Sequence, residues 1–326
     1  MYFTPKNSFF HGIMFHHFHN TSNHLKGQGS ISRNDFIKII KFIGLKNIIS
    51  PEESIKYITK KSNIYKKRIN KVCLTFDDSL KCQYDIVLPV LEKYNLKAFF
   101  FIYSGAFSKE PELLEIHRYF RVNYFKNINE FYYNFFKILF YSNPNAEKFL
   151  KNKRLQIKLN KKKYPFYSLN DIKFRLIRDH YLVIDDYNNL MEYMFKIYKF
   201  KPKNIIKDLF MSKKNLLEII KKGHSVGLHS HSHPTHIEKL PYSLQENEYK
   251  KNLNFINNIL KKKSYKINSV SHPCGSYSLS TLKILFDLKI DIGFKNFLDR
   301  NQYKSKFSNL EIDRENHALI IKRLKK

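Results

Sequence analysis

The sequence concentrates its chemically versatile side chains in a short histidine-rich segment. Residues 223–236, GHSVGLHSHSHPTH, hold five histidines, at positions 224, 229, 231, 233 and 236. Because neutral imidazole is the commonest metal ligand in proteins, this clustering indicates a metal site. Pro234 disfavours a helical backbone at His233, so His229 and His233 need not share a helical turn. In an extended segment His229, His231 and His233 would face the same side, so the spacing leaves open which two of them bind.

Two adjacent acids follow an apolar segment earlier in the chain. Residues 72–76, VCLTF, predict a buried strand that ends at Asp77 and Asp78. In α/β sheets and barrels, ligands bind at the carboxyl ends of parallel strands. Two carboxylates there can divide the work, with one as a metal ligand and the other as a base. An isolated acidic pair also fits a solvated turn.

Two weaker candidates lie near the ends of the sequence. His16 and His17 stand at the end of a short strand predicted within residues 13–18. His317 stands in DRENHALII, residues 313–321, before a segment that we interpret as an apolar strand. A single histidine in such a place is more often structural than catalytic.

Strands and helices alternate around the acidic pair. The strand at 72–76 is followed by a helical pattern at 84–95, which Pro89 disturbs, and by a second apolar strand at 98–103. Strands that are apolar throughout are typical of a parallel sheet covered on both faces. A further helix is expected at 31–47. The alternation resumes after residue 222, with strands near 223–229, 267–271, 290–294 and 317–321 and a helix at 279–288.

Residues 106–222 interrupt this alternation. They lack short apolar strands bounded by turns, and they carry aromatic residues at helical spacing, such as Phe131, Tyr132 and Phe135. We therefore predict a mostly helical insertion at 106–222, and we expect it to influence substrate choice rather than the chemistry.

In their order along the chain, these motifs resemble those of the polysaccharide deacetylase family, carbohydrate esterase family 4, which is also called the NodB-homology domain. TFDDS at 75–79 resembles the family's first motif, TFDDG, with Ser79 in place of glycine. HSHSH at 229–233 resembles the second motif, H-[ST]-x-x-H. SHPCGSYS at 271–278 resembles the third motif in its Pro-x-Gly form.

The resemblance implies a distorted (β/α) barrel of six to eight strands, formed by residues 1–105 and 223–326, with a divalent metal that is most often Zn²⁺. By motif position, Asp78, His229 and His233 would bind this metal, and His231 would not. Asp77 would be the base. A metal with three protein ligands keeps a position open for water and lowers the pKa of that water.

Two family residues have no match at their usual places. The arginine that steadies the catalytic aspartate usually stands at the start of the third motif, where this sequence has Ser271 and His272. The late histidine that usually serves as general acid is not matched cleanly either. His317 is the best remaining candidate for this acid, and Arg314 is the candidate for the missing arginine.

Composition limits the class of protein. The 326 residues carry 59 Lys and Arg against 28 Asp and Glu, which gives a net charge of +31. Abundant Lys, Asn, Ile, Phe and Tyr with nine Gly and no Trp indicate a compositional bias that accounts for most of this charge. The segments 60–71 and 150–163 are basic with interleaved apolar residues, but they show no nucleic-acid-recognition signature. No apolar run is long enough to span a membrane.

The N-terminus lacks the pattern of a signal peptide, and the three scattered cysteines rule out a disulfide scaffold, so we expect a cytoplasmic protein. The sequence thus predicts a metal-dependent carbohydrate deacetylase that acts on an N-acetylated sugar. The positive charge fits a nucleotide-linked or lipid-linked sugar, or peripheral association with a membrane, and no specific nucleic acid is expected. The alternatives are an O-acetyl esterase of the same fold and an inactive carbohydrate-binding relative.

Overall fold

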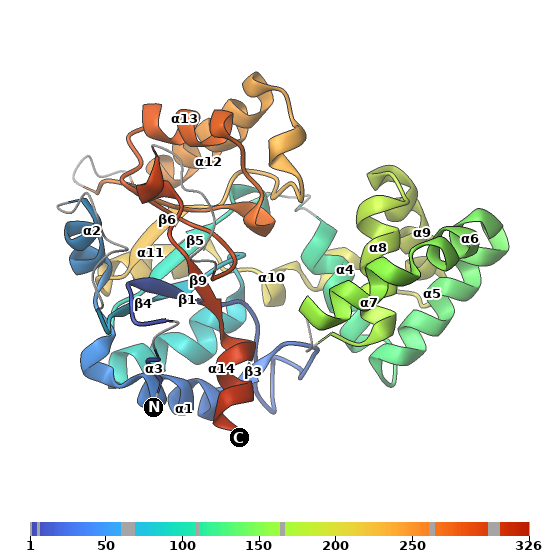
Figure 1. The fold of residues 1–326 in the computed structure, drawn as a ribbon, viewed down its shortest axis with the longest axis horizontal. Helices are drawn as coiled ribbons and strands as arrows, with labels where there is room; N and C mark the ends of the chain where they lie inside the picture. Colours follow the sequence, from blue (N-terminus) through green and yellow to red (C-terminus); the bar gives the residue numbers. More distant parts are fainter. Residues whose placement is uncertain are drawn as a thin grey trace. The chain divides into compact units, whose positions relative to one another are not determined.

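Short apolar stretches form the strands of a parallel sheet in the computed structural model (Figure 1). The structure describes residues 2–4, 7–59, 69–108, 111, 113–163, 167–260, 265–298 and 307–325. Most of the basic segment at 60–71 therefore lies outside the described residues. The strands are β1 (His11–Phe15), β2 (Phe18–His19), β3 (Ile31–Ser32), β4 (Val72–Phe76), β5 (Phe99–Ile102), β6 (Ser225–Leu228), β7 (Ser269–Ser271), β8 (Ile292–Phe294) and β9 (Arg314–Asn316).

Seven of these strands form one sheet in the order β8-β7-β6-β5-β4-β1-β9, and every neighbouring pair is parallel. β2 and β3 form a separate pair. Phe15 is in register with Phe76, so β1 and β4 end at the same level. In the same way Ile102 of β5 is in register with Leu228 of β6. The residues that follow these strands must therefore emerge on one rim.

The sheet curls into a nearly closed barrel. Ile312, just before β9, forms a parallel bridge with Phe294 of β8. Its backbone N–H donates to the Gly293 carbonyl, and its carbonyl accepts from Lys295 N, both at 2.8 Å. Gly293 is needed at this closure, because a Cβ there would lie 2.6 Å from the Leu310 carbonyl oxygen. The expected distorted (β/α) barrel of six to eight strands is confirmed.

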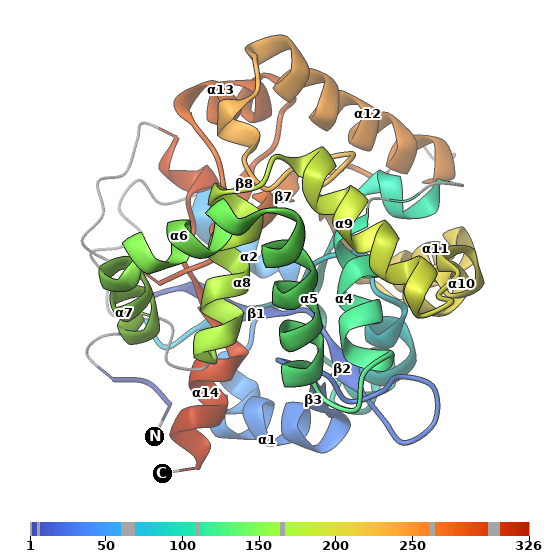
Figure 2. The ribbon, with the colours of Figure 1, turned by 90° about the vertical axis from the view of Figure 1, so that its right-hand side faces the viewer.

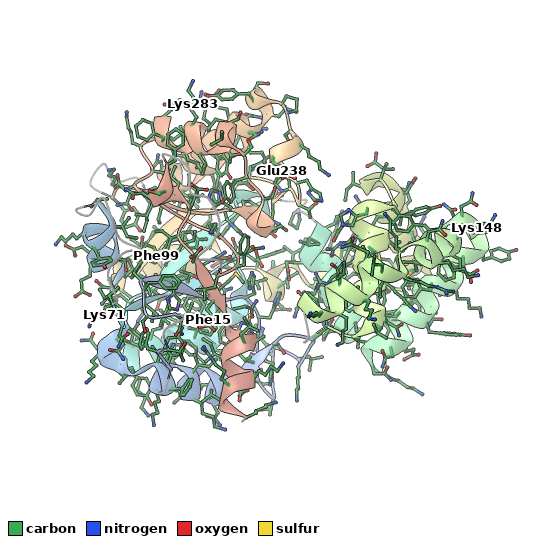
Figure 3. The ribbon with its side chains drawn as sticks, viewed as in Figure 1. Phe15, Lys71, Phe99, Lys148, Glu238 and Lys283 are labelled. Atoms are coloured by element: carbon green, nitrogen blue, oxygen red, sulfur yellow. The ribbon has the colours of Figure 1, made fainter. Side chains whose placement is uncertain are left out.

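Aromatic side chains fill both faces of the sheet. Phe99, Phe101 and Phe294 are fully buried in one cluster. Phe15 and Phe76 stack on each other on the other face, where Phe15 meets Phe36 of helix α1 (Arg33–Ile43) edge to face. Figure 3 shows Phe15 and Phe99 inside this part of the protein and Lys283 on its surface.

Helices cover the outside of the barrel. The remaining α-helices of this part are α2 (Pro51–Thr59), α3 (Leu88–Lys93), α11 (Lys213–Lys221), α12 (Tyr242–Leu260), α13 (Leu279–Asp287) and α14 (His317–Leu324). Shorter helical turns are η1 (Leu45–Asn47), η2 (Gln83–Val87), η3 (Ser104–Phe107), η5 (Ile237–Lys239), η6 (Pro273–Gly275) and η7 (Ser308–Leu310). η2 is a π-helical turn directly before α3, and it lies where Pro89, which has no N–H, removes an ordinary helical hydrogen bond.

One expected strand is wrong. The apolar residues near 317–321 form helix α14 instead, and only Arg314–Asn316 before them form a strand. The Asn316 side chain accepts a hydrogen bond from Ala318 N and caps the helix. His317 and Ile320, three residues apart, are buried on one helical face. A short apolar run does not by itself distinguish a strand from a helix.

The chain divides into two compact units, Met1–Glu112 with Lys207–Lys326, and Leu113–Ile206. The predicted insertion at 106–222 thus contains the whole second unit, while α11 near its end belongs to the barrel unit. The helices of residues 113–209 are α4 (Leu113–Asn123), α5 (Ile128–Ser142), α6 (Pro144–Asn152), α7 (Arg154–Lys163), α8 (Leu169–His180), α9 (Ile184–Ile197), η4 (Pro202–Asn204) and α10 (Ile206–Leu209).

The helical unit has a core of its own. Figure 2 shows α4, α5, α8 and α9 beside one another. Phe131, Tyr132 and Phe135 of α5 are fully buried, and each of their rings packs against the ring of Phe174 of α8. In the described residues of either unit, no helix combines the length and the apolar character that crossing a bilayer requires.

Candidate active site

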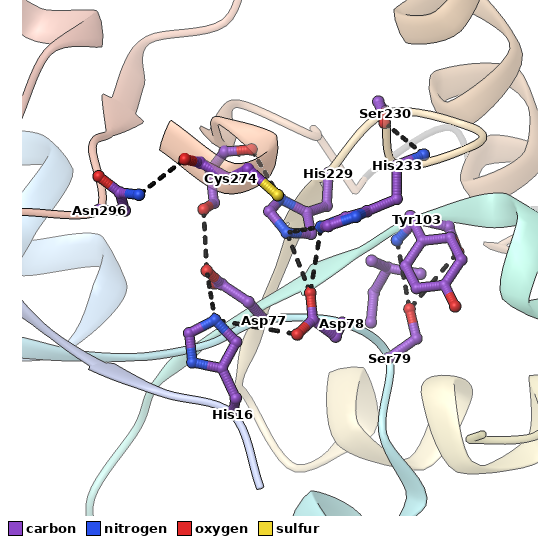
Figure 4. Close-up of polar contacts among 12 residues, drawn as sticks. His16, Asp77, Asp78, Ser79, Tyr103, His229, Ser230, His233, Cys274 and Asn296 are labelled. Atoms are coloured by element: carbon purple, nitrogen blue, oxygen red, sulfur yellow. Dashed lines mark hydrogen bonds and ion pairs between the residues drawn. The ribbon is translucent and has the colours of Figure 1, made fainter. Parts of the chain in front are cut away.

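The carboxyl ends of the barrel strands bring acids and histidines together (Figure 4). Asp77 and Asp78 follow β4, His229 follows β6, and His16 follows β1. Asp77 and Asp78 are almost fully buried, as is His229. Because the strands are parallel, residues far apart in the sequence share this rim.

Asp78, His229 and His233 converge on one point. Oδ1 of Asp78 lies 3.3 Å from Nε2 of His229 and 3.3 Å from Nε2 of His233. The two Nε2 atoms are 3.2 Å apart. Among the described residues, this trio is the group whose side-chain geometry could hold a metal ion.

Local backbone geometry decides which histidines converge. Ser230 and His233 have positive φ angles of 63° and 55°, so the loop is not extended and alternate residues do not share a face. His231 turns away, and its Nδ1 lies 2.8 Å from Ser104 Oγ. The spacing left open which two of the three histidines converge. The left-handed backbone conformation of Ser230 and His233 brings His229 and His233 together and leaves His231 out.

A backbone carbonyl orients the first of these histidines. Nδ1 of His229 lies 2.8 Å from the carbonyl oxygen of Ser271, to which it donates a hydrogen bond when it carries the proton. This arrangement leaves Nε2 of His229 with a lone pair that points at the shared centre. A hydrogen bond of this kind commonly fixes the orientation of a metal-binding histidine.

The donor set and its spacing fit a divalent metal. One carboxylate oxygen and two imidazole nitrogens are typical ligands of catalytic zinc. A tetrahedral metal with bonds of about 2.0 Å keeps its ligand atoms about 3.3 Å apart. The separations here are 3.2 and 3.3 Å. Asp78, His229 and His233 can therefore hold a metal with room for further ligands.

Asp77 points to different partners. Nη1 of Arg314 donates to its carboxylate at 2.8 Å, and Ser271 Oγ donates to Oδ2 at 3.1 Å. Arg314 is itself buried, and its Nη2 donates to Ser271 Oγ at 2.8 Å. Arg314 Nε also donates to the Lys295 carbonyl. Arg314 of β9, the candidate for the family's missing arginine, thus lies against the Asp77 carboxylate.

The surroundings keep Asp77 ionised. Burial, the largest single influence, would raise the pKa of this carboxyl, but Arg314, His229 and His16 act in the opposite direction and together lower it below its ordinary value. The pKa of Asp78 lies well below its ordinary value; burial opposes this, while positive charge at His16 and hydrogen bonds from His229 and His233 lower it. Both acids are therefore carboxylates at neutral pH.

The loop after β4 has an unusual backbone. Asp78 and Ser79 both have positive φ angles, 77° and 58°, a region that glycine adopts most easily. Ser79 occupies the place of the family's glycine, and its Oγ accepts from Tyr103 N at 3.2 Å. The Tyr103 ring in turn packs against the His233 ring, with centroids 5.5 Å apart. Ser79 and Tyr103 thus link the loop that carries Asp78 with the loop that carries His233.

His16 is better placed than the sequence suggested. Its Nε2 lies 3.8 Å from Oδ2 of both Asp77 and Asp78, and its side chain is 28% exposed. Gln83 donates to the carbonyls of His16 and Asp77, at 2.9 and 2.5 Å, and so ties the two strand ends together. The signal for His16 was its position after a strand, which is the signal that singled out Asp77.

His317 has different neighbours. Its Nδ1 lies 3.2 Å from the Met14 carbonyl oxygen, and its Nε2 lies 3.1 Å from the Gly29 carbonyl oxygen. Its ring stacks on Phe15. Burial lowers the pKa of His317 to about 4, so the ring is neutral at ordinary pH. These contacts hold the ring in place and direct both of its nitrogens at backbone oxygens.

The other histidines of the cluster have structural partners. Nδ1 of His224 accepts from Ala98 N at 3.2 Å, and burial lowers the pKa of this histidine to about 4. His236 lies 3.1 Å from Glu238. Neither residue belongs to the trio that could hold a metal ion.

The barrel and its rim of acids and histidines define a hydrolase-like α/β protein, and comparison with known proteins places it in a family. The sequence matches the family described as polysaccharide deacetylase over residues 65–119 and 185–293. The match covers half of the chain, and this chain belongs to the polysaccharide deacetylase family. The family resemblance of the motifs is thereby confirmed. A search of curated proteins returns no significant match.

Solved structures show the same fold at low sequence identity. The deacetylase PplD from Streptococcus pyogenes, in complex with acetate, aligns with a TM-score of 0.53 at 16% identity, over 94% of this chain and 92% of that one. IcaB from Ammonifex degensii gives 0.53 at 13%, over 95% and 91%. The deacetylase domain of BpsB from Bordetella bronchiseptica gives 0.50 at 12%, over 96% and 97%.

Proposed function

We propose that this protein is a metal-dependent hydrolase that removes the acetyl group from an N-acetylated sugar. Membership of the polysaccharide deacetylase family gives the class of carbohydrate deacetylases. The observation that carries the finer proposal is the pairing of a three-ligand group, Asp78, His229 and His233, with a separate carboxylate, Asp77, which accepts a hydrogen bond from Arg314 and whose pKa is lowered.

The residues divide the chemistry among them. A divalent metal held by Asp78, His229 and His233, most commonly Zn²⁺ in sites of this composition, supplies a Lewis acid next to the reacting carbonyl. Asp77 accepts a proton from the attacking water, because its carboxylate is ionised and buried beside this centre. Arg314 and Ser271 hold the carboxylate in position for that transfer.

The leaving amine needs a proton when the carbon–nitrogen bond breaks. We assign this proton to His16 rather than to His317. His16 is partly exposed and lies close to both aspartates, whereas both ring nitrogens of His317 face backbone carbonyls. The overall reaction consumes one water and yields acetate and a free amine.

The substrate and its setting form part of the proposal. An acetylated sugar linked to a nucleotide or a lipid pyrophosphate fits the net charge of +31. A cytoplasmic setting fits three cysteines that form no disulfide, of which Cys73 and Cys82 are buried.

Acetate release tests the proposal. The chelator-stripped protein is assayed with and without added Zn²⁺ on N-acetylated and O-acetylated sugars, both oligomeric and nucleotide-linked. We expect zinc-dependent acetate release from N-acetylated substrates. Release from O-acetylated sugars alone would identify an esterase, and zinc binding without release from any substrate would favour an inactive carbohydrate-binding protein.

A further inference from the structure

Helix α7 carries a pair of apolar residues that do not contribute to the core of the helical unit. Leu155 and Leu159, one helical turn apart, are 71% and 53% exposed. Ile157 lies on the opposite side of the same helix and is buried. The helix therefore already contributes Ile157 to the core, and the two leucines form a second apolar stripe that faces outward.

Basic residues surround this stripe. The α6–α7 segment, residues 144–163, contains eight Lys and Arg and a single acid, Glu147. Lys158 and Lys162 stand three residues after Leu155 and Leu159, so they flank the stripe on the helix surface. Figure 3 shows Lys148 of α6 on the surface of the helical unit.

The positive charge of the α6–α7 segment exceeds that of other helices in this lysine-rich chain. Helix α9 of the same unit has three acids and one lysine, and it also carries an exposed apolar pair, Tyr193 and Ile197. An exposed apolar pair is therefore not unique to α7. The combination of such a pair with a dense positive field distinguishes the α6–α7 segment.

A cavity of about 390 Å³ lies against the same segment, within the helical unit. Its walls combine apolar and basic side chains, and Glu147 pairs with one of the lysines at 2.8 Å. The residues that matter here are the apolar Phe136, Leu150 and Ile157 and the basic Lys151, Arg154 and Lys173. The basic side chains of this lining add to the positive charge of the segment.

We propose that the α6–α7 segment docks on the surface of a bilayer that contains anionic phospholipids. Leu155 and Leu159 insert among the lipid headgroups and upper acyl chains, while Lys158 and Lys162 lie near the phosphates. A nucleic-acid backbone would use the lysines but would give no partner to the leucine stripe.

Vesicle flotation tests this docking on the full-length protein. The probes are vesicles of phosphatidylcholine alone and vesicles of equal parts phosphatidylcholine and phosphatidylglycerol. We expect binding to the anionic vesicles that weakens as salt rises. The pair Lys158→Glu and Lys162→Glu should weaken it at least roughly tenfold. The pair Leu155→Ser and Leu159→Ser should weaken it roughly tenfold as well.

Matched variants serve as controls. Tyr193→Ser with Ile197→Ser removes another exposed apolar pair, from α9. Lys283→Glu with Lys322→Glu makes the same charge change on exposed lysines of the barrel unit. Both should bind vesicles like the unchanged protein. Thermal melts confirm folding, and acetate release from a soluble sugar is measured separately, so a failed docking and a failed deacetylase proposal are told apart.

Three outcomes would overturn the docking proposal. The first is binding that does not distinguish anionic from neutral vesicles. The second is equal loss in the control and α6–α7 variants. The third is binding of duplex DNA that is at least as tight as vesicle binding and insensitive to the leucine pair, which would assign the surface to a nucleic acid.

Discussion

Two adjacent aspartates with different partners define the site at the scale of single residues. Asp78 faces two histidine nitrogens, and Asp77 faces a guanidinium and a hydroxyl. The same residue type can thus serve as a ligand and as a base, because neighbouring groups and not the side chain itself decide its role.

The variant Asp77→Asn is expected to separate these roles. It should bind one equivalent of zinc but lose turnover by about 10²–10⁴-fold, because an amide cannot accept the proton. Metal analysis and acetate release on the same preparation measure both quantities. Asp78→Asn is the matched variant and should lose metal affinity; loss of metal from Asp77→Asn would mean that the two roles are reversed.

Arg314 should set the lower pH limit of activity. Its guanidinium lowers the pKa of Asp77, so Arg314→Met should raise that pKa and move the acidic limb of the kcat/KM profile to higher pH. Arg314→Lys keeps the charge and should shift the limb less. Because folding lowers the pKa of Asp77, its carboxylate stabilises the folded protein at pH values above its unfolded pKa, and this stabilisation is lost as the pH falls through its folded pKa. The Arg314→Met protein should therefore be less stable than the unchanged protein at neutral pH. An unchanged acidic limb in a folded Arg314→Met protein would contradict this role.

The two candidate proton donors can be told apart. His16→Ala should bind zinc and lower kcat by about 10²-fold or more, with the loss reduced for substrates whose leaving group needs no proton. His317→Ala should mainly lower the melting temperature, because His317 packs on Phe15 and contacts two carbonyls. If His317→Ala abolished turnover at unchanged stability and His16→Ala did not, His317 would be the acid.

At the scale of elements, the loops that follow the strands determine which side chains converge at the site. The loop after β6 has positive φ at Ser230 and His233, which brings His229 and His233 together and sends His231 to Ser104. The segment after β7 behaves in a similar way: Cys274, within η6, has a φ of 53°, and Asn296 Nδ2 donates to its carbonyl at 2.7 Å. Residues in such strained conformations cluster at functional sites.

This loop geometry predicts unequal effects of two nearby substitutions. His229→Ala should lose most of the bound zinc, while His231→Ala should keep one equivalent, because His231 contacts Ser104 and not the metal-site trio. Metal analysis after chelation and reconstitution provides the measurement. Zinc loss in His231→Ala with retention in His229→Ala would reverse the assignment.

At the scale of the whole molecule, the residues that we assign to the reaction and the helical unit belong to different parts of the chain. Every residue that we assign to the reaction belongs to the barrel unit, and the helical unit has its own aromatic core. Low identity to solved deacetylases, 12–16%, accompanies alignments that cover more than nine-tenths of this chain. The fold thus persists where most side chains differ.

A variant in which a Gly/Ser linker replaces residues 113–206 tests this separation. We expect it to fold, to bind zinc and to release acetate from a simple N-acetylated sugar, while its preference among larger substrates changes. Relative kcat/KM values across the substrate panel measure that preference. An unchanged preference would show that the helical unit does not influence substrate choice.

Local sequence determined much of this protein. The apolar segment VCLTF forms β4 at the residues expected, because a fully apolar run fits a strand that is covered on both faces. Asp77 and Asp78 lie on the rim because they directly follow the carboxyl end of this strand. The spacing of the histidines was enough to indicate a metal site, and the motifs were enough to indicate the family.

Only the tertiary structure decided the partners of Asp77. Arg314 lies 237 positions away in sequence, and Ser271 lies 194 positions away, yet both donate to the same carboxylate. Parallel strands bring their carboxyl ends to one rim regardless of the chain length between them, so no local pattern reports which strand ends become neighbours. The same reason explains why sequence alone does not show that His16 lies beside both aspartates. The apolar run after His317 is a helix for a different reason: a short apolar run fits either element, and the Asn316 cap and the buried face of the helix appear only in the structure.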